Sequence, residues 1–152
     1  MRRSLRNILT IVPLLALMFM VLGGFLSSAA IAADVVIVAN NSVSDVALTK
    51  DTLKKIYLGK QVKWGDGNKI YLAALKKSDV HKTFTKTYVS KSPSQFRMFW
   101  KKMVFTGKGK APKSFESDAA MLKYVSSTEG AIGYISSGAS PDGVKTITLS
   151  DN

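Results

Sequence analysis

Apolar and polar positions alternate along the chain in a pattern typical of strands joined by helices. Residues 35–39 are four β-branched side chains and an alanine, and the polar run Asn40-Asn41-Ser42 follows them. This pattern predicts a buried strand that ends in a turn. Residues 70–75 are apolar on both alternating faces, as in a strand that helices cover on both sides. Residues 131–135 and 144–149 predict two further strands.

Helical periodicity follows the first strand. Thr49 is placed to cap a short helix in which Leu53, Ile56 and Tyr57 share one face, and Gly59 stands where a helix C-terminal glycine belongs. The segment 64–68 (WGDGN) then reads as a turn before the second strand.

A second helix is predicted after residue 78, with Ser78 or Asp79 as its cap. Its apolar side chains recur every four residues and are Val80, Phe84 and Tyr88.

A third helix begins at Ser92-Pro93-Ser94-Gln95, which combines a capping serine, a proline at the first helical position and a glutamine at the third. Its apolar stripe is Phe96, Phe99, Trp100 and Met103, while Arg97, Lys101 and Lys102 are expected to face water.

Residues 106–113 read as a basic loop rich in glycine, and a fourth helix follows with Ser117 as its cap. Its apolar side chains are Met121, Leu122 and Val125, and Gly130 ends it. The predicted order is strand, helix, strand, three helices and two strands. This order predicts an α/β fold with a mixed sheet flanked by helices.

The first residues have the layout of a secretory signal peptide. Arg2, Arg3 and Arg6 precede an apolar stretch, and residues 27–33 are small apart from Ile31. Ala30 and Ala32 predict cleavage before Ala33, which divides the chain into a signal peptide (1–32) and a single domain (33–152). The alternative is an uncleaved membrane anchor.

Composition narrows the class of protein. The sequence has no cysteine, so an exported chain lacks disulfides, thiolate ligands and a lipoprotein anchor, and a bacterial periplasm is the expected location. After residue 32 it has 19 basic and ten acidic residues, a net charge of +9, and Arg97 is the only arginine among them. Such a surface attracts anions diffusely, or is merely well solvated. No nucleic-acid-binding motif accompanies the charge.

The sequence has no enzyme signature. His81 is the only histidine, so catalytic triads and histidine-rich metal sites lack their parts. We therefore expect a binding protein that needs no cofactor.

An anion site is predicted where the second strand meets the second helix. Lys76, Lys77, Ser78 and Asp79 lie at this junction, where open α/β sheets bind ligands. The free amides of Asp79 and Val80, the positive end of the helix dipole and the two lysines suit an oxyanion. The Asp79 carboxylate repels sulfate but can accept a proton from a protonated phosphate. The alternative is an ordinary solvated loop.

Asn41 and Ser42, at the end of the first strand, are expected near this site and complete the predicted ligand-binding set.

Several segments resemble the phosphate-binding periplasmic proteins of ABC uptake systems. These are residues 48–60 (LTKDTLKKIYLGK), 64–66 (WGD) and 130–135 (GAIGYI). Residues 92–96 (SPSQF), 99–100 (FW) and 105–109 (FTGKG) resemble short exported relatives of that family. The resemblance covers nearly all of the chain after the signal peptide. It implies one lobe of a type 2 periplasmic-binding protein.

The resemblance also implies a ligand and partners. In the family an arginine followed by Ser-Gly-Thr begins the anion-binding helix, and here Lys76, Lys77, Ser78 and Asp79 stand in its place, with Thr83 further on. The implied function is binding of phosphate or a related oxyanion for ABC transporter membrane subunits or a sensor. A homodimer could supply the wall that a second lobe provides in the family.

The alternative function is that of a periplasmic interaction protein that keeps the lobe fold without ligand capture. Its candidate surface is the loop 106–113 beside Arg97, Lys101 and Lys102.

Overall fold

The computed structural model describes residues 34–151, and the predicted signal peptide (1–32) lies outside these residues. Within them, six strands and four helices follow one another in an α/β order. In chain order they are β1 (Val35–Ala39), β2 (Ala47–Thr49), α2 (Lys50–Tyr57), β3 (Tyr71–Leu75), α3 (Asp79–Tyr88), α4 (Pro93–Phe105), β4 (Lys113–Phe115), α5 (Asp118–Ser127), β5 (Ala131–Ser136) and β6 (Lys145–Ser150).

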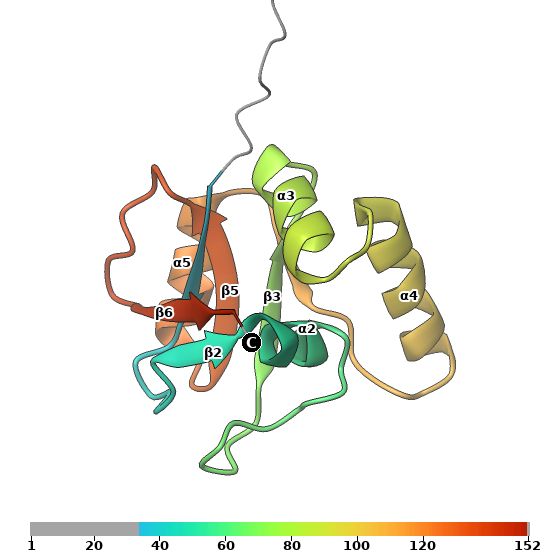
Figure 1. The fold of residues 1–152 in the computed structure, drawn as a ribbon, viewed down its shortest axis with the longest axis horizontal. Coiled ribbons are helices and arrows are strands. Elements are labelled where there is room, and N and C mark those ends of the chain that lie inside the picture. Colours follow the sequence, from blue (N-terminus) through green and yellow to red (C-terminus); the bar gives the residue numbers. More distant parts are fainter. Residues whose placement is uncertain (1–33, 152) are drawn as a thin grey trace, which may run out of the picture. The chain divides into compact units, whose positions relative to one another are not determined.

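The strands form one mixed sheet in the order β2-β6-β1-β5-β3-β4. β1 is antiparallel to both of its neighbours, β5 and β6. The other neighbouring pairs are parallel: β2 with β6, β3 with β5, and β3 with β4. The predicted mixed α/β sheet is therefore confirmed (Figure 1).

Helices cover both faces of this sheet, as alternate residues of β5 show. A Cβ at Gly133 would meet Met121 and Val125 of α5, so this position faces α5. The next side chain, Tyr134, packs against Tyr57 of α2 and Phe84 of α3. Because successive strand residues point to opposite faces, α5 lies on one face and α2 and α3 lie on the other.

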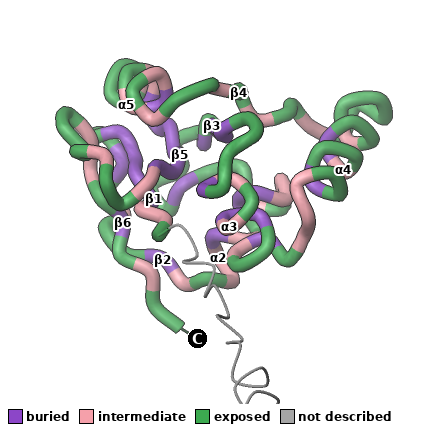
Figure 2. Tube along the Cα trace, turned by 90° about the horizontal axis from the view of Figure 1, so that it is seen from above, coloured by how far each residue is buried: buried purple, intermediate pink, exposed green. Residues whose placement is uncertain are grey.

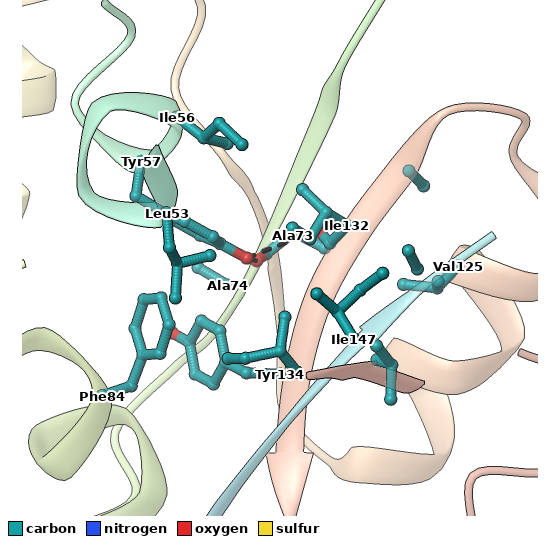
Figure 3. Packing of buried hydrophobic residues seen from close by; sticks show 14 of the residues in the cluster. Leu53, Ile56, Tyr57, Ala73, Ala74, Phe84, Val125, Ile132, Tyr134 and Ile147 are labelled. Atoms are coloured by element: carbon teal, nitrogen blue, oxygen red, sulfur yellow. Dashed lines mark hydrogen bonds between the residues drawn. The ribbon is translucent and has the colours of Figure 1, made fainter. Parts of the chain in front are cut away.

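An aromatic cluster fills the core between the sheet and α2 and α3 (Figure 3). The rings of Phe84 and Tyr134 stack with centroids 3.7 Å apart, and the ring of Tyr57 meets Phe84 edge-on at 4.6 Å. The Tyr57 hydroxyl donates to the carbonyl oxygen of Ala73 at 3.0 Å. Burial raises the pKa of Tyr57 well above its usual value, so this hydroxyl keeps its proton. Each fully buried side chain of this size contributes roughly 1.5–3 kcal/mol to folding.

Helix starts lie at the predicted serines and threonine. Each cap has extended backbone, and its side-chain oxygen accepts an N–H from the first turn. In α4 the reciprocal bond is also present, from the Ser92 N–H to the Gln95 side chain at 2.8 Å. The caps are Thr49, Ser78, Ser92 and Ser117.

Two strands were not predicted. β2 and β4 have three residues each, too few to display an alternating pattern. They are the two outermost strands of the sheet. β4 begins at Lys113, at the end of the predicted basic loop, and its pairing with β3 brings residues 113–116 beside the predicted anion site.

Burial is concentrated in the sheet and the helix faces that cover it, whereas α4 is exposed along much of its length (Figure 2). Of the predicted α4 stripe, Phe96 and Trp100 are buried, and Phe99 and Met103 are partly buried. No helix within residues 34–151 has the length and hydropathy needed to cross a membrane.

Candidate functional site

The candidate site is built around the start of α3. The apolar strand β3 ends at Leu75, and Lys76 and Lys77 lead to Ser78, whose extended backbone makes it the cap of α3. The Ser78 hydroxyl oxygen accepts the N–H of His81 at 3.0 Å. The N–H groups of Asp79 and Val80 donate to no acceptor in residues 34–151. Two amides and one hydroxyl hydrogen thus remain available at the positive end of the helix dipole.

The two lysines of this junction differ in their surroundings. The Lys76 ammonium forms an ion pair with Glu116, just past the end of β4, and the Lys76 N–H donates to the Phe115 carbonyl oxygen at 2.7 Å. No carboxylate of the described chain lies within ion-pair distance of Lys77. Lys77 is therefore the more available cation for a bound anion. Glu116 was not foreseen, because β4 was not predicted.

The start of α3 opens into a groove of about 1350 Å³, which we call the α3–α4 groove. Its lining residues come from the start of α3 and the ends of β3 and β4 on one side, and from α4 on the other. Five cationic side chains and two carboxylates line it: Lys76, Lys77, Lys82, Arg97, Lys101, Asp79 and Glu116. The local charge is therefore positive, which favours an anionic ligand.

The α4 side of the groove is mostly apolar. Trp100 is 4% exposed and its indole N–H donates to the Tyr57 carbonyl oxygen at 3.2 Å, which fixes α4 against α2. Val104 and Phe105, at the end of α4, are 50% and 92% exposed. Arg97 and Lys101 also line the groove, whereas the sequence predicted that they face water and, in the alternative function, that they form part of an interaction surface.

His81 is a member of the site that sequence reasoning left out. It lines the groove and is the third residue of α3, and its Nδ1 lies 2.6 Å from the Tyr134 hydroxyl oxygen. That oxygen also accepts the Leu75 N–H at 3.1 Å. The position of Ser78 as cap was the available signal, because it places residue 81 in the first turn.

The protonation of this pair follows from burial. Burial raises the pKa of the Tyr134 phenol well above its usual value and lowers that of the His81 imidazole below 6.5. The phenol therefore keeps its proton, and its short contact with Nδ1 is a hydrogen bond between two neutral groups. His81 thus brings a neutral imidazole to the groove at pH 7.

Asn41 and Ser42 do not join this site, and the expectation that they lie near it is wrong. β1 runs antiparallel to β5, whereas β3 runs parallel to β5. The C-terminal end of β1 therefore lies beside the N-terminal ends of β3 and β5, at the opposite end of the sheet from Lys76. There the Ser42 hydroxyl accepts the Gly130 N–H at 3.0 Å, and the Asn41 amide donates to the Gly143 carbonyl at 3.3 Å.

Ser42 lines a second pocket, of about 500 Å³, at that far end of the sheet. Its other residues include Trp64, Lys69, Tyr71 and Glu129. The Lys69 ammonium lies 5.3 Å from the centre of the Tyr71 ring, and the Trp64 indole donates to the Gly130 carbonyl at 2.9 Å. Within residues 34–151, no three His, Asp or Glu side chains are grouped to hold a metal ion in either place.

No family model matches the chain, and no curated protein matches its sequence. Among solved structures, the fold is similar to a phosphate ABC transporter substrate-binding protein of Clostridium perfringens with bound phosphate (TM-score 0.62, 18% identity). It is also similar to PstS of Borrelia burgdorferi (0.60, 14%) and to an ABC-type phosphate transport receptor of Vibrio cholerae (0.54, 20%).

Each comparison covers 77% of this chain, but only 45%, 47% and 46% of the other chains in the same order. The chain thus spans less than half the length of these proteins. It has the fold of one lobe of a PstS-like periplasmic binding protein, which confirms the fold that the sequence resemblance implied.

Proposed function

We propose that this protein is an exported, non-enzymatic solute-binding protein that holds phosphate or a related oxyanion at the start of α3. The observation that carries the proposal is the set of free donors there: the amides of Asp79 and Val80 and the Ser78 hydroxyl. Lys76 and Lys77 add positive charge. Two of the similar structures, a phosphate ABC transporter substrate-binding protein with bound phosphate and an ABC-type phosphate transport receptor, support this ligand class.

The local charges favour a weakly held anion. An oxyanion at the start of α3 gains from the helix dipole and from Lys77, but it competes with Glu116 for Lys76. Asp79 disfavours a fully ionised anion and favours one that keeps a proton to donate. Because Lys77 and Ser78 are exposed, salt screens the attraction. We expect high-micromolar to millimolar binding, with phosphate preferred to sulfate.

The proposal extends to location and partners. Residues 1–32 act as a signal peptide, residues 33–152 form the binding domain, and the mature protein is periplasmic. There it serves the membrane subunits of an ABC-type importer or a sensor, and a second copy can close over the anion. The arginine-rich start and the small residues before Ala33 support export.

A second candidate function is that of an interaction protein that keeps the lobe fold without ligand capture. The observation that favours it is the ion pair of Lys76 with Glu116, which already satisfies one of the two lysines. Its surface is the loop 106–113 with Arg97, Lys101 and Lys102.

Calorimetric titration with phosphate at low salt tests the proposed function. Binding should disappear in the triple variant Lys76→Ala, Lys77→Ala, Ser78→Ala. The matched control is Lys86→Ala, Lys123→Ala, Ser117→Ala, which removes the same charge and one helix cap at positions outside the groove. The control should fold and bind as the parent does.

Two outcomes would contradict the proposal. The first is a parent protein, monomeric or dimeric, that ignores phosphate and sulfate up to several millimolar. The second is equal binding by the triple variant and the parent. The first outcome favours the interaction protein.

A further inference from the structure

The α3–α4 groove has a larger volume than an oxyanion needs. Its volume of about 1350 Å³ is above the range of roughly 300–1,000 Å³ that is typical of small-molecule sites. The anion site occupies only its α3 end. The lining of the groove includes six apolar side chains with which an oxyanion cannot form polar contacts, which are Pro93, Phe96, Trp100, Val104, Phe105 and Pro112.

The end of α4 presents apolar surface without a partner in the described chain. Phe105 is 92% exposed, more than any other large apolar side chain of residues 34–151, and Val104 beside it is 50% exposed. Phe96 and Trp100, on earlier turns, are buried, so the apolar surface runs from the core outward along α4. Exposed aromatic side chains at the edge of a groove are common in protein-binding sites.

The polar side chains of α4 that line the groove indicate the charge of the ligand that it would bind. Arg97 and Lys101 lie one turn apart on α4 and both line the groove, and neither forms an ion pair with a described residue. Arg97 is the only arginine after the predicted signal peptide. Its planar guanidinium suits a carboxylate, which it can bind through two parallel hydrogen bonds.

The edge of the sheet adds a backbone surface. β4 is an outermost strand, pairs with β3 alone in the described chain, and contributes Ser114 to the groove. The outer edge of such a strand can pair with an extended peptide. A second copy of the chain does not complement the positive charge of Arg97 and Lys101, because residues 34–151 carry 19 basic and only ten acidic side chains. A bilayer surface does not enter a groove between two walls.

We propose that the α3–α4 groove binds an extended acidic segment of a partner protein. The carboxylates of the segment pair with Arg97 and Lys101, and an apolar side chain packs on Val104 and Phe105. This binding does not depend on the oxyanion function, because the residues that carry it belong to α4.

Selection from a library of random peptides of about ten residues, followed by fluorescence anisotropy of the enriched peptides, tests this inference. Acidic sequences with one or two large apolar residues should be enriched. Their affinity should fall by roughly tenfold or more in Phe105→Ser and in the double variant Arg97→Gln, Lys101→Gln. The control Lys86→Gln, Lys123→Gln removes the same charge elsewhere and should bind as the parent does.

A further double variant distinguishes the oxyanion site from the peptide site. Lys77→Ala, Ser78→Ala should weaken phosphate binding and leave the peptide affinity within about twofold of that of the parent. The inference is overturned if acidic sequences are not enriched, or if the enriched peptides bind the α4 variants as tightly as the parent. Phe105-dependent binding to phosphatidylglycerol vesicles without peptide binding would identify a membrane surface instead. Phe105-dependent dimerisation without peptide binding would identify a second copy.

Discussion

The hydroxyl oxygen of Tyr134, in the middle of the sheet, lies 2.6 Å from Nδ1 of His81, in the first turn of α3. The same hydroxyl accepts the N–H of Leu75, the last residue of β3. One side chain of β5 thus connects the strand and the helix on either side of the loop 76–78. The geometry of the candidate site therefore depends on the core as well as on the loop.

The burial of His81 makes folding stability depend on pH. Burial lowers the pKa of His81 below its ordinary value of 6.5, so between the folded and unfolded pKa values the unfolded chain binds more protons. The free energy of unfolding should therefore fall as the pH is lowered through 6.5, and level off below the folded pKa. Urea denaturation between about pH 8 and about pH 5.5 measures this dependence.

Substitution of the histidine provides the control. Since His81 is the only histidine, His81→Gln should remove most of the pH dependence in this interval. A variant with the full pH dependence of the parent would place its origin in other groups.

The position of α4 depends on Trp100. Its ring is buried beside Gly59 and Gly109, and its N–H donates to the Tyr57 carbonyl. Trp100→Ala should reduce the free energy of unfolding by roughly 3–5 kcal/mol. The control on the same helix is Phe105→Ala, which should change it by about 0.5 kcal/mol or less because Phe105 is exposed. Similar values for the two variants in denaturant titration would mean that α4 does not pack through Trp100.

Gly130 is required by the backbone around it. It has φ +73°, and a Cβ there would overlap the carbonyl oxygen of Lys69. Its own carbonyl accepts the N–H groups of Tyr71 and Trp64. Gly130→Ala should therefore lower the free energy of unfolding by more than about 2 kcal/mol, because a residue with a side chain is strained at this positive φ and its Cβ would overlap the Lys69 carbonyl oxygen.

Gly67→Ala is the matched control for this prediction. Gly67 also has positive φ, +88°, but nothing lies within 4 Å of its added Cβ. The Gly67→Ala variant should therefore lose only about 1–2 kcal/mol of its free energy of unfolding, which is the cost of backbone strain alone. If thermal melting gives both alanine variants the same loss, the overlap at Gly130 contributes nothing.

Local features of the fold could be predicted, because they depend on neighbouring residues. The caps at Ser78 and Ser92 follow from side chains that bond amides three residues later. Strand directions depend on pairing partners far along the chain, and no local pattern encodes them. For this reason Asn41 and Ser42 were expected at the wrong end of the sheet. The same holds for β4 and hence for Glu116, whose ion pair with Lys76 joins residues 40 positions apart.

Export of the protein to the periplasm tests whether the signal peptide is cleaved before Ala33. Ala30 and Ala32 satisfy the small-residue rule for cleavage, so periplasmic protein should begin at Ala33 in intact mass spectrometry. Ala32→Arg, which breaks the rule, should give uncleaved precursor. Recovery of the parent chain with Met1 in the membrane fraction would show an uncleaved anchor instead.

The contribution of Ser78 to anion binding can be separated from its contribution to folding, because the chain contains a matched cap. Ser78 and Ser117 both have φ −146°, with ψ 160° and 159°, and each accepts an amide three residues later, at 3.0 and 3.2 Å. Each alanine substitution should therefore cost about 1 kcal/mol of stability. Only Ser78→Ala should weaken phosphate binding, since Ser117 does not line the groove.

A third variant completes this comparison. Ser78→Thr keeps a hydroxyl at the cap and should retain most of both properties. If Ser78→Ala and Ser117→Ala weaken phosphate binding equally, the loss reflects a less stable domain and the hydroxyl is not a ligand. If neither weakens it, the amides of Asp79 and Val80 with Lys77 bind the anion without Ser78. If Ser78→Ala alone weakens it at a stability equal to that of Ser117→Ala, the hydroxyl contacts the anion directly.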